Sequence, residues 1–199
     1  MSEIFKIEIP SDPSDKEVAG ALSRLPRWRL EKALSFKRQI DRFLCAEAYL
    51  LLKDALHEVY GLNWDFTFKY GINGKPVLAG IPGIHFNLSH CRRCVCCAVS
   101  DSPVGIDVED IQFDIDLAKA VLNDDELGRV LSSARPEIEF TRFWTMKESL
   151  LKLTGEGIRD DLKSVLSNSG AIFSSEVNTE RGYAISVAEH CGEEQAQKP

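Results

Sequence analysis

An apolar run that carries acids at alternate positions constrains this chain most. Residues 103–109 read Pro-Val-Gly-Ile-Asp-Val-Glu, a pattern typical of a β-strand. Side chains alternate across a strand, so Asp107 and Glu109 share one face while Val108 points into a core. A solvated strand face is the plainer interpretation of this pair when it is taken alone.

A second segment, residues 144–152, places an acid and a base on one helical stripe. Glu148 and Lys152 follow Trp144 at steps of four, the spacing of one helix face. A strand with two acids beside this helix would form a small anionic pocket with a cationic rim. Such a pocket suits Mg²⁺, which takes oxygen ligands and is usually shared between carboxylates and substrate phosphates.

Both segments resemble the signature of the 4′-phosphopantetheinyl transferase superfamily. Gly105-Ile106-Asp107 matches its Gly-Ile/Val-Asp element. Residues 144–152 match its Trp/Phe-Ser/Thr-x-Lys-Glu-Ser/Ala-x-x-Lys element at every typed position. The 37 positions from Asp107 to Trp144 are slightly fewer than in the family.

Further matches extend the resemblance over most of the chain. They are, in order, Gly74-Lys75-Pro76, Phe86-Asn87-Leu88-Ser89-His90, Asp125-Glu126-Leu127 and Gly155-Glu156-Gly157. The length and the N-terminal elements favour the larger, surfactin-synthetase-activating type over the short trimeric holo-acyl-carrier synthases. We therefore expect a monomer.

The resemblance implies an α+β fold of two similar α/β halves related by a pseudo-twofold axis, with the active site in the groove between them. We expect residues 1–102 to form the N-terminal half, which carries the coenzyme A-binding elements. Residues 103–191 would form the C-terminal half, with the metal-binding and catalytic signature, and residues 192–199 a polar tail. Periodicity alone indicates only a mixed α+β class.

The implied reaction moves the 4′-phosphopantetheine arm of coenzyme A to a serine of an apo acyl or peptidyl carrier protein and releases 3′,5′-ADP. Asp107 and Glu109 would hold Mg²⁺ against the pyrophosphate. Glu148 would be a third metal ligand, the base for the serine proton, or both. Lys152 would stabilise the charge on the α-phosphate. Lys147 lies about 100° round the helix from Glu148 and would be orienting or structural.

The resemblance assigns coenzyme A recognition mainly to the first half. Lys75 and Pro76 would flank the adenine, and Ser89 and His90 would donate hydrogen bonds to phosphate oxygens. Arg42 would reach the 3′-phosphate. A strand-end histidine satisfied by the backbone is the plainer interpretation of His90.

The charge distribution bears on the partners. A net charge of −7 argues against general nucleic-acid binding. Residues 24–42 nevertheless carry many more basic than acidic side chains. This basic stretch predicts an anionic partner, such as the 3′-phosphate or an acidic carrier, or else a solvated face with weak ion pairs. Arg27 is the alternative to Arg42 for the phosphate.

The compartment is predicted from two features. No segment approaches the roughly 20 apolar residues of a membrane span, and residues 1–6 lack the basic and apolar regions of a signal peptide. We therefore expect a cytoplasmic protein without membrane contact. The run Cys94–Val99 is typical of a buried strand in which free cysteine acts as a small hydrophobe; a structural zinc is the alternative.

Periodicity and turn residues predict the order of elements. Strands are expected at 4–9, 64–68, 85–88, 95–99, 104–108, 171–177 and 183–188, and a turn at 71–74. Helices are expected at 16–25, 30–60, 115–122, 124–131 and 137–153, the last ended by Gly155.

Two other functions remain open on the residues alone. A Mg²⁺-dependent pyrophosphate hydrolase acting on coenzyme A-like nucleotides would use the same acids with water as the nucleophile. A non-catalytic module that binds coenzyme A or a carrier would not need all three acids.

Overall fold

The computed structural model describes residues 2–63, 65–71, 73–157, 161–167 and 169–191. The elements of the first half of the chain are β1 (Glu3–Glu8), α1 (Asp15–Ser23), α2 (Arg27–Leu34), α3 (Gln39–Tyr60), β2 (Phe68–Tyr70), β3 (Pro76–Leu78), β4 (His85–His90) and β5 (Cys94–Ser100). Those that follow are β6 (Val104–Asp110), α4 (Ile115–Val121), α5 (Asp124–Ser132), α6 (Pro136–Thr154), β7 (Ala171–Asn178) and β8 (Tyr183–His190).

The same topology occurs twice along the chain. One three-stranded sheet has the order β1-β5-β4 and another has the order β6-β8-β7, and every neighbouring pair is antiparallel. In each, the first strand is followed by a long helix, and the last strand returns to the middle of the sheet. The predicted α+β class with two similar halves is therefore confirmed.

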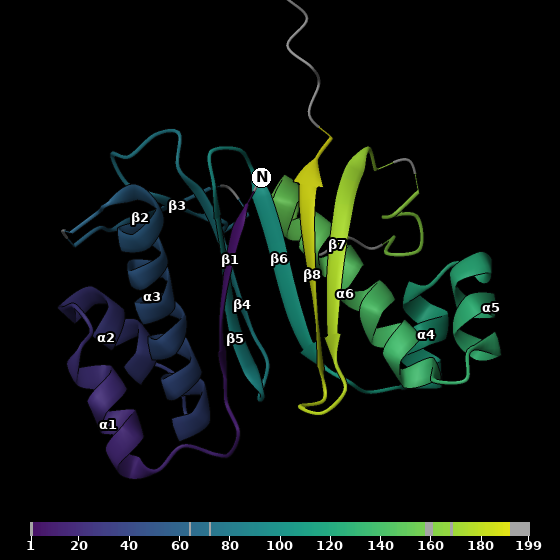
Figure 1. The fold of residues 1–199 in the computed structure, drawn as a ribbon, viewed down its shortest axis with the longest axis horizontal. Helices are drawn as coiled ribbons and strands as arrows, with labels where there is room; N and C mark the ends of the chain where they lie inside the picture. The colour runs from purple at the N-terminus through teal and green to yellow at the C-terminus, as the bar shows by residue number, and fades with distance from the viewer. Residues whose placement is uncertain (1, 64, 72, 158–160, 168, 192–199) are drawn as a thin grey trace, which may run out of the picture.

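The sheets lie between the helices. Figure 1 shows α1, α2 and α3 outside the first sheet and α4, α5 and α6 on the far side of the second. Strand β5 is buried along its whole length because it packs on both faces. Val95, Cys97 and Val99 belong to the cluster around α3, whereas Cys94 and Cys96 belong to the cluster with β6 and β8.

The cysteines of β5 therefore serve as small apolar side chains. The buried-strand interpretation of residues 94–99 is confirmed, since every residue of β5 is buried. The cysteines of the described part are free thiols. That part also contains no group of three or more His, Cys, Asp or Glu side chains placed to hold a metal.

The helix predicted over residues 30–60 is wrong in one respect, because the chain bends between α2 and α3. Neither glycine nor proline marks the break. Phe36 turns its ring against the first core cluster, and its carbonyl accepts a hydrogen bond from Arg42 Nε at 2.8 Å. A side chain at the start of α3 thus satisfies a backbone group that a continuous helix would have paired internally.

The strand predicted at 64–68 is also wrong, since the strand begins at Phe68 and pairs with β3, which the pattern did not indicate. Trp64 lies outside the described residues. Phe66 is buried and stacks on Phe68 at a ring separation of 5.8 Å, with Tyr49 of α3 beside both. Aromatic packing against α3 therefore decides the path of this segment.

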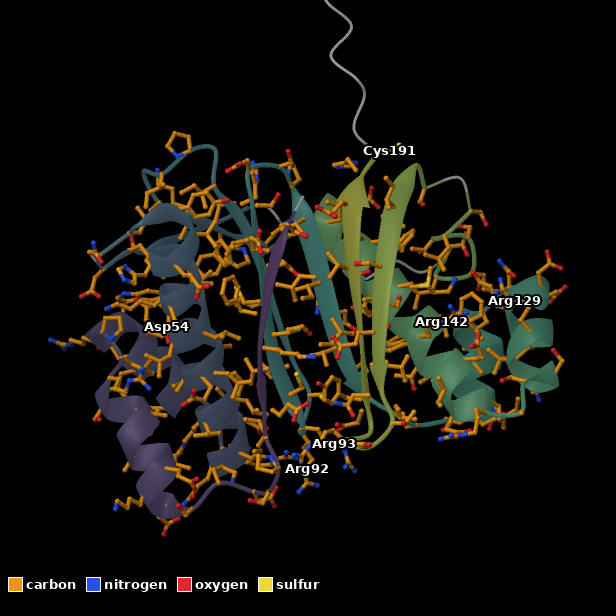
Figure 2. The ribbon with its side chains drawn as sticks, in the orientation of Figure 1. Asp54, Arg92, Arg93, Arg129, Arg142 and Cys191 are labelled. Atoms are coloured by element: carbon orange, nitrogen blue, oxygen red, sulfur yellow. The ribbon has the colours of Figure 1, made fainter. Side chains whose placement is uncertain are left out.

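The two sheets are also joined by charged groups at the edge where β1 ends. Figure 2 shows Arg92 and Arg93 there, at the turn between β4 and β5. Arg92 binds both carboxylate oxygens of Asp12, and Arg93 pairs with Asp110 of β6 at 3.4 Å. Arg93 thus links the turn of the first sheet to the second.

Within the described residues, no helix has the length and apolarity required to cross a membrane. The predicted polar tail, residues 192–199, lies outside the described part.

Candidate active site

The site begins with an unusually close approach of strand β6 to helix α6. A Cβ atom added to Gly105 would lie 1.9 Å from the Ser149 carbonyl oxygen and 2.5 Å from the Leu153 nitrogen. Only glycine fits at this contact, which explains the glycine of the Gly-Ile-Asp motif. Because Asp107 and Glu109 share the face of Gly105, they are directed towards α6.

Gly105→Ala is expected to destabilise the protein by about 1–3 kcal/mol, since the methyl group must displace backbone atoms of α6. Urea unfolding followed by circular dichroism measures this change. Gly128→Ala is the matched control, because an added Cβ on the exposed face of α5 meets nothing within 4 Å. That variant should be unchanged or more stable by up to about 1 kcal/mol. Equal stability of the two variants would contradict the close-packing argument.

Asp107 forms the centre of the site. It is 2% exposed, and its Oδ1 atom is 2.5 Å from Lys152 Nζ. The Ser89 hydroxyl donates to the same oxygen at 2.8 Å. Its Oδ2 atom is buried and has no hydrogen-bond partner in the described structure. Burying an unpaired carboxylate oxygen costs free energy, so we expect a further cation or hydrogen-bond donor beside it.

Strand β4 positions Asp107 from the other half of the chain. The Asn87 side chain accepts from the Ile106 amide at 3.0 Å, and Ser89 Oγ accepts from the Val108 amide at 3.3 Å. Lys152 Nζ also donates to Ser89 Oγ at 2.9 Å. Alternate side chains of β4 therefore replace a backbone ladder between β4 and β6.

The other two acids are held at raised pKa values. Burial raises the pKa of Glu109 to about 7, and the charge of Asp107 adds to the increase, while a hydrogen bond with Trp144 opposes it. Burial also raises the pKa of Glu148, followed by the charge of Asp107. Crowded acids that repel one another are typical of sites where charge must be neutralised.

These observations fit a bound Mg²⁺. The donors are carboxylate oxygens, the type that Mg²⁺ prefers, and the unpartnered Oδ2 of Asp107 offers a free acceptor. Asp107, Glu109 and Glu148 are nonetheless not placed as a ready ligand group, since none exists within the described residues. The ligand set therefore stays a prediction.

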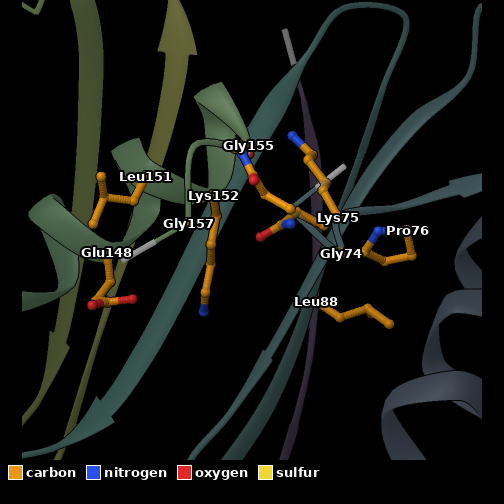
Figure 3. A pocket seen from close by; sticks show the side chains of 11 residues that line it. Gly74, Lys75, Pro76, Leu88, Glu148, Leu151, Lys152, Gly155 and Gly157 are labelled. Atoms are coloured by element: carbon orange, nitrogen blue, oxygen red, sulfur yellow. The ribbon is translucent and has the colours of Figure 1, made fainter. Parts of the chain in front are cut away.

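A pocket of about 250 Å³ opens beside this cluster. Figure 3 shows Glu148 and Lys152 of α6 on one side and Lys75, Pro76 and Leu88 on the other. Residues of both halves line it, namely Asn73, Gly74, Lys75, Pro76, Asn87, Leu88, Glu148, Leu151, Lys152, Gly155 and Gly157. The structure thus brings four of the predicted site residues around one cavity, while Asp107 and Ser89 lie next to it through Lys152.

His90 ends strand β4 near the same cluster. Although the residue is exposed at the strand end, partial burial of its ring lowers its pKa, and the positive charge of Lys152 lowers it further. Charges on Asp41 and Arg29 also act on the ring. His90 is thus within electrostatic reach of Lys152 on α6 and of Arg29 in the basic stretch.

The arginines of the basic stretch differ in their surroundings: some donate hydrogen bonds to backbone carbonyls, and others are exposed to solvent. Arg29 donates to the Cys45 carbonyl at 3.1 Å, and Arg42 is held by the Phe36 carbonyl. Arg27 has a side chain that is 93% exposed and pairs with Glu31 at 3.1 Å. Neither Arg27 nor Arg42 lines the pocket. A partner for this surface stays a prediction.

Lys147 is structural, one of the two roles considered for it. Its side chain is fully buried and lies 2.8 Å from Glu126 Oε2 and 3.0 Å from the Leu162 carbonyl oxygen. Glu126 also accepts from the Asn123 amide in the capping box of α5. This ion pair joins α5 and α6 to the segment that follows the pocket.

Two asparagines to which no sequence pattern assigns a role also contribute to the site. Asn87 lies inside the matched motif of residues 86–90, so the sequence contains a signal that it belongs to the site. Asn73 donates to the Gly155 carbonyl at 2.9 Å, a contact between positions far apart in the chain. Only the turn pattern around residue 73 marked it.

Comparison with known proteins agrees with this geometry. The profile of the 4′-phosphopantetheinyl transferase superfamily matches residues 103–195. A 4′-phosphopantetheinyl transferase of Bacillus pumilus is 39% identical over 171 residues, which cover 81% of this chain and 72% of that protein. One from Bacillus subtilis is 33% identical over 168 residues, covering 81% and 74%.

A more distant relative is the L-aminoadipate-semialdehyde dehydrogenase-phosphopantetheinyl transferase of Saccharomyces cerevisiae. It is 30% identical over 190 residues, which cover 87% of this chain and 69% of the yeast protein. A match over 87% of this chain extends into both halves. The chain belongs to the 4′-phosphopantetheinyl transferase superfamily.

Proposed function

We propose that this protein is an enzyme that transfers the 4′-phosphopantetheine arm of coenzyme A to a serine of an apo acyl or peptidyl carrier protein. The observation that carries the proposal is the shared pocket, where Glu148 and Lys152 face the Lys75–Pro76 turn across the junction of the halves. Family membership supports the same reaction class. Residues 1–102 would supply most coenzyme A contacts and residues 103–191 the chemistry, in a monomer.

Coenzyme A would lie along the pocket wall formed by the first half. Pro76 and the aliphatic stem of Lys75 line this wall and would flank the adenine. His90 would contact phosphate oxygens, and Arg42 or Arg27 would reach the 3′-phosphate. The Ser89 hydroxyl already donates a hydrogen bond to Asp107, so a phosphate contact from Ser89 would require this hydroxyl to rotate.

Mg²⁺ would be held by Asp107, Glu109 and Glu148. When bound, such an ion supplies charge neutralisation at the pyrophosphate oxygens. The remaining work falls to the side chains. Lys152, now paired with Asp107, would steady the phosphate charge that develops as 3′,5′-ADP leaves.

Glu148 would accept the proton of the attacking serine. Its side chain lines the pocket beside Lys152, which places the carboxylate where a bound substrate would lie. The serine oxygen forms a bond to the β-phosphorus, and the bond from that phosphorus to the bridging oxygen breaks. The electron pair stays on the 3′,5′-ADP that is released.

Nucleotide release with and without carrier tests the proposal. Purified protein is incubated with coenzyme A and Mg²⁺, and 3′,5′-ADP is quantified by chromatography. Transfer predicts release only when an apo carrier is present. Release without carrier would indicate a pyrophosphate hydrolase, and coenzyme A binding without release would indicate a non-catalytic module.

A further inference from the structure

The tip of the β2–β3 hairpin reaches across to the end of helix α6. Lys75 Nζ donates to the Leu153 carbonyl at 3.0 Å and to the Val104 carbonyl at 3.3 Å. Asn73 Nδ2 donates to the Gly155 carbonyl at 2.9 Å. In Figure 3 the Lys75 side chain runs towards Gly155 and away from Glu148. Its amine therefore donates hydrogen bonds to backbone carbonyls of the protein.

One of these contacts satisfies a group that the helix leaves open. The last carbonyls of an α-helix lack internal partners and carry the negative end of the helix dipole. Leu153 O is one of them, since α6 ends at Thr154. The cation at Lys75 and the amide at Asn73 are the donors expected there. Both come from the first half, whereas α6 belongs to the second.

The hairpin also forms one wall of the pocket. Pro76 and the Lys75 stem line it on the hairpin side, and Glu148 and Lys152 line it on the α6 side. Because β2 and β3 pair only with each other among the described strands, the backbone of the hairpin is not fixed by either main sheet. Phe68 and Leu78 pack in the first core cluster and hold the base of the hairpin, so the contacts at its tip determine how closely its outer end approaches α6.

We propose that Asn73 and Lys75 are positioning residues that form a latch, docking the β2–β3 hairpin onto the C-terminal end of α6 and so holding the pocket in its binding-competent shape. The inference rests on the proposed function only in naming coenzyme A as the ligand. Opening the latch would separate the walls without removing any group that performs the chemistry. The affinity measured for a ligand falls with the fraction of protein in the competent state.

Lys75→Met tests the latch, because methionine keeps the apolar stem and loses the amine. In the protein without ligand, hydrogen exchange should accelerate together at the hairpin and at residues 153–157, while the exchange in β5 stays unchanged. The KM for coenzyme A should rise about three- to tenfold, and kcat at saturation should stay within about twofold. Lys75→Arg should restore most of the protection.

Lys69→Met is the matched control, since Lys69 is an exposed lysine on the same hairpin and should leave exchange and KM unaltered. Asn73→Ser is the milder second variant and should accelerate exchange in the same two segments. Weaker coenzyme A binding with unchanged exchange in Lys75→Met would overturn the latch, because the amine would then act on the ligand itself. Unchanged exchange together with unchanged binding would overturn it as well. If the wild type binds no coenzyme A, the proposed function fails, and the exchange measurement still decides the latch.

Discussion

Asp107→Asn is expected to lower kcat/KM for phosphopantetheine transfer by at least about 10²-fold while leaving the protein folded. Asparagine keeps the shape and the hydrogen bond from Ser89 but removes the charge that pairs with Lys152. Lys152 can turn to water, since its side chain is 29% exposed. Steady-state kinetics at saturating Mg²⁺, with the melting temperature measured in parallel, checks both expectations.

Glu176→Gln is the matched control for this loss. Glu176 also pairs with a lysine, Lys6, but lies on strand β7 away from the pocket. Its activity should be that of the wild type. EDTA should abolish the activity of the wild-type protein, and added Mg²⁺ should restore that activity. A folded Asp107→Asn variant with wild-type kcat/KM would show that the charge of Asp107 is not used in the reaction.

Lys147→Met is expected to destabilise the protein by about 3–5 kcal/mol, the cost of leaving a buried charge without its partner. Glu126 would keep the Asn123 amide but lose its cation, and the Leu162 carbonyl would lose a donor. In a protein of this size, each kcal/mol lowers the melting temperature by about 2–4 °C. Calorimetry of the purified variant measures the change.

A control variant and a second variant distinguish the effect of leaving a buried charge unpaired from the effect of removing any lysine. Lys53→Met removes a lysine whose pair with Asp65 is largely exposed, so its stability should stay within about 0.5 kcal/mol. Adding Glu126→Gln to Lys147→Met should recover part of the loss, because no unpaired charge remains. A double variant no more stable than Lys147→Met would contradict the ion-pair argument.

The placement of the candidate site residues on one strand face and one helix stripe could be predicted because their signals are local. Strand alternation places Asp107 and Glu109 on one face, and helical spacing places Glu148 and Lys152 on one stripe. Both patterns lie within a few positions of sequence. The structure brings the two elements together through Gly105, whose missing side chain lets β6 touch α6.

The contacts between the halves could not be predicted in this way. The bonds from Lys75 to Val104 and Leu153 join distant positions, and no periodicity encodes them. The bend between α2 and α3 depends likewise on the packing of Phe36 and on Arg42. Strand β3 is too short to give a pattern of its own.

The most direct test of the central claim is the intact mass of an apo carrier protein after incubation with this protein, coenzyme A and Mg²⁺. Transfer predicts that the carrier gains the mass of one phosphopantetheine, and that a carrier whose acceptor serine is replaced by alanine gains none. A carrier of unchanged mass, with coenzyme A nevertheless consumed, would contradict transfer.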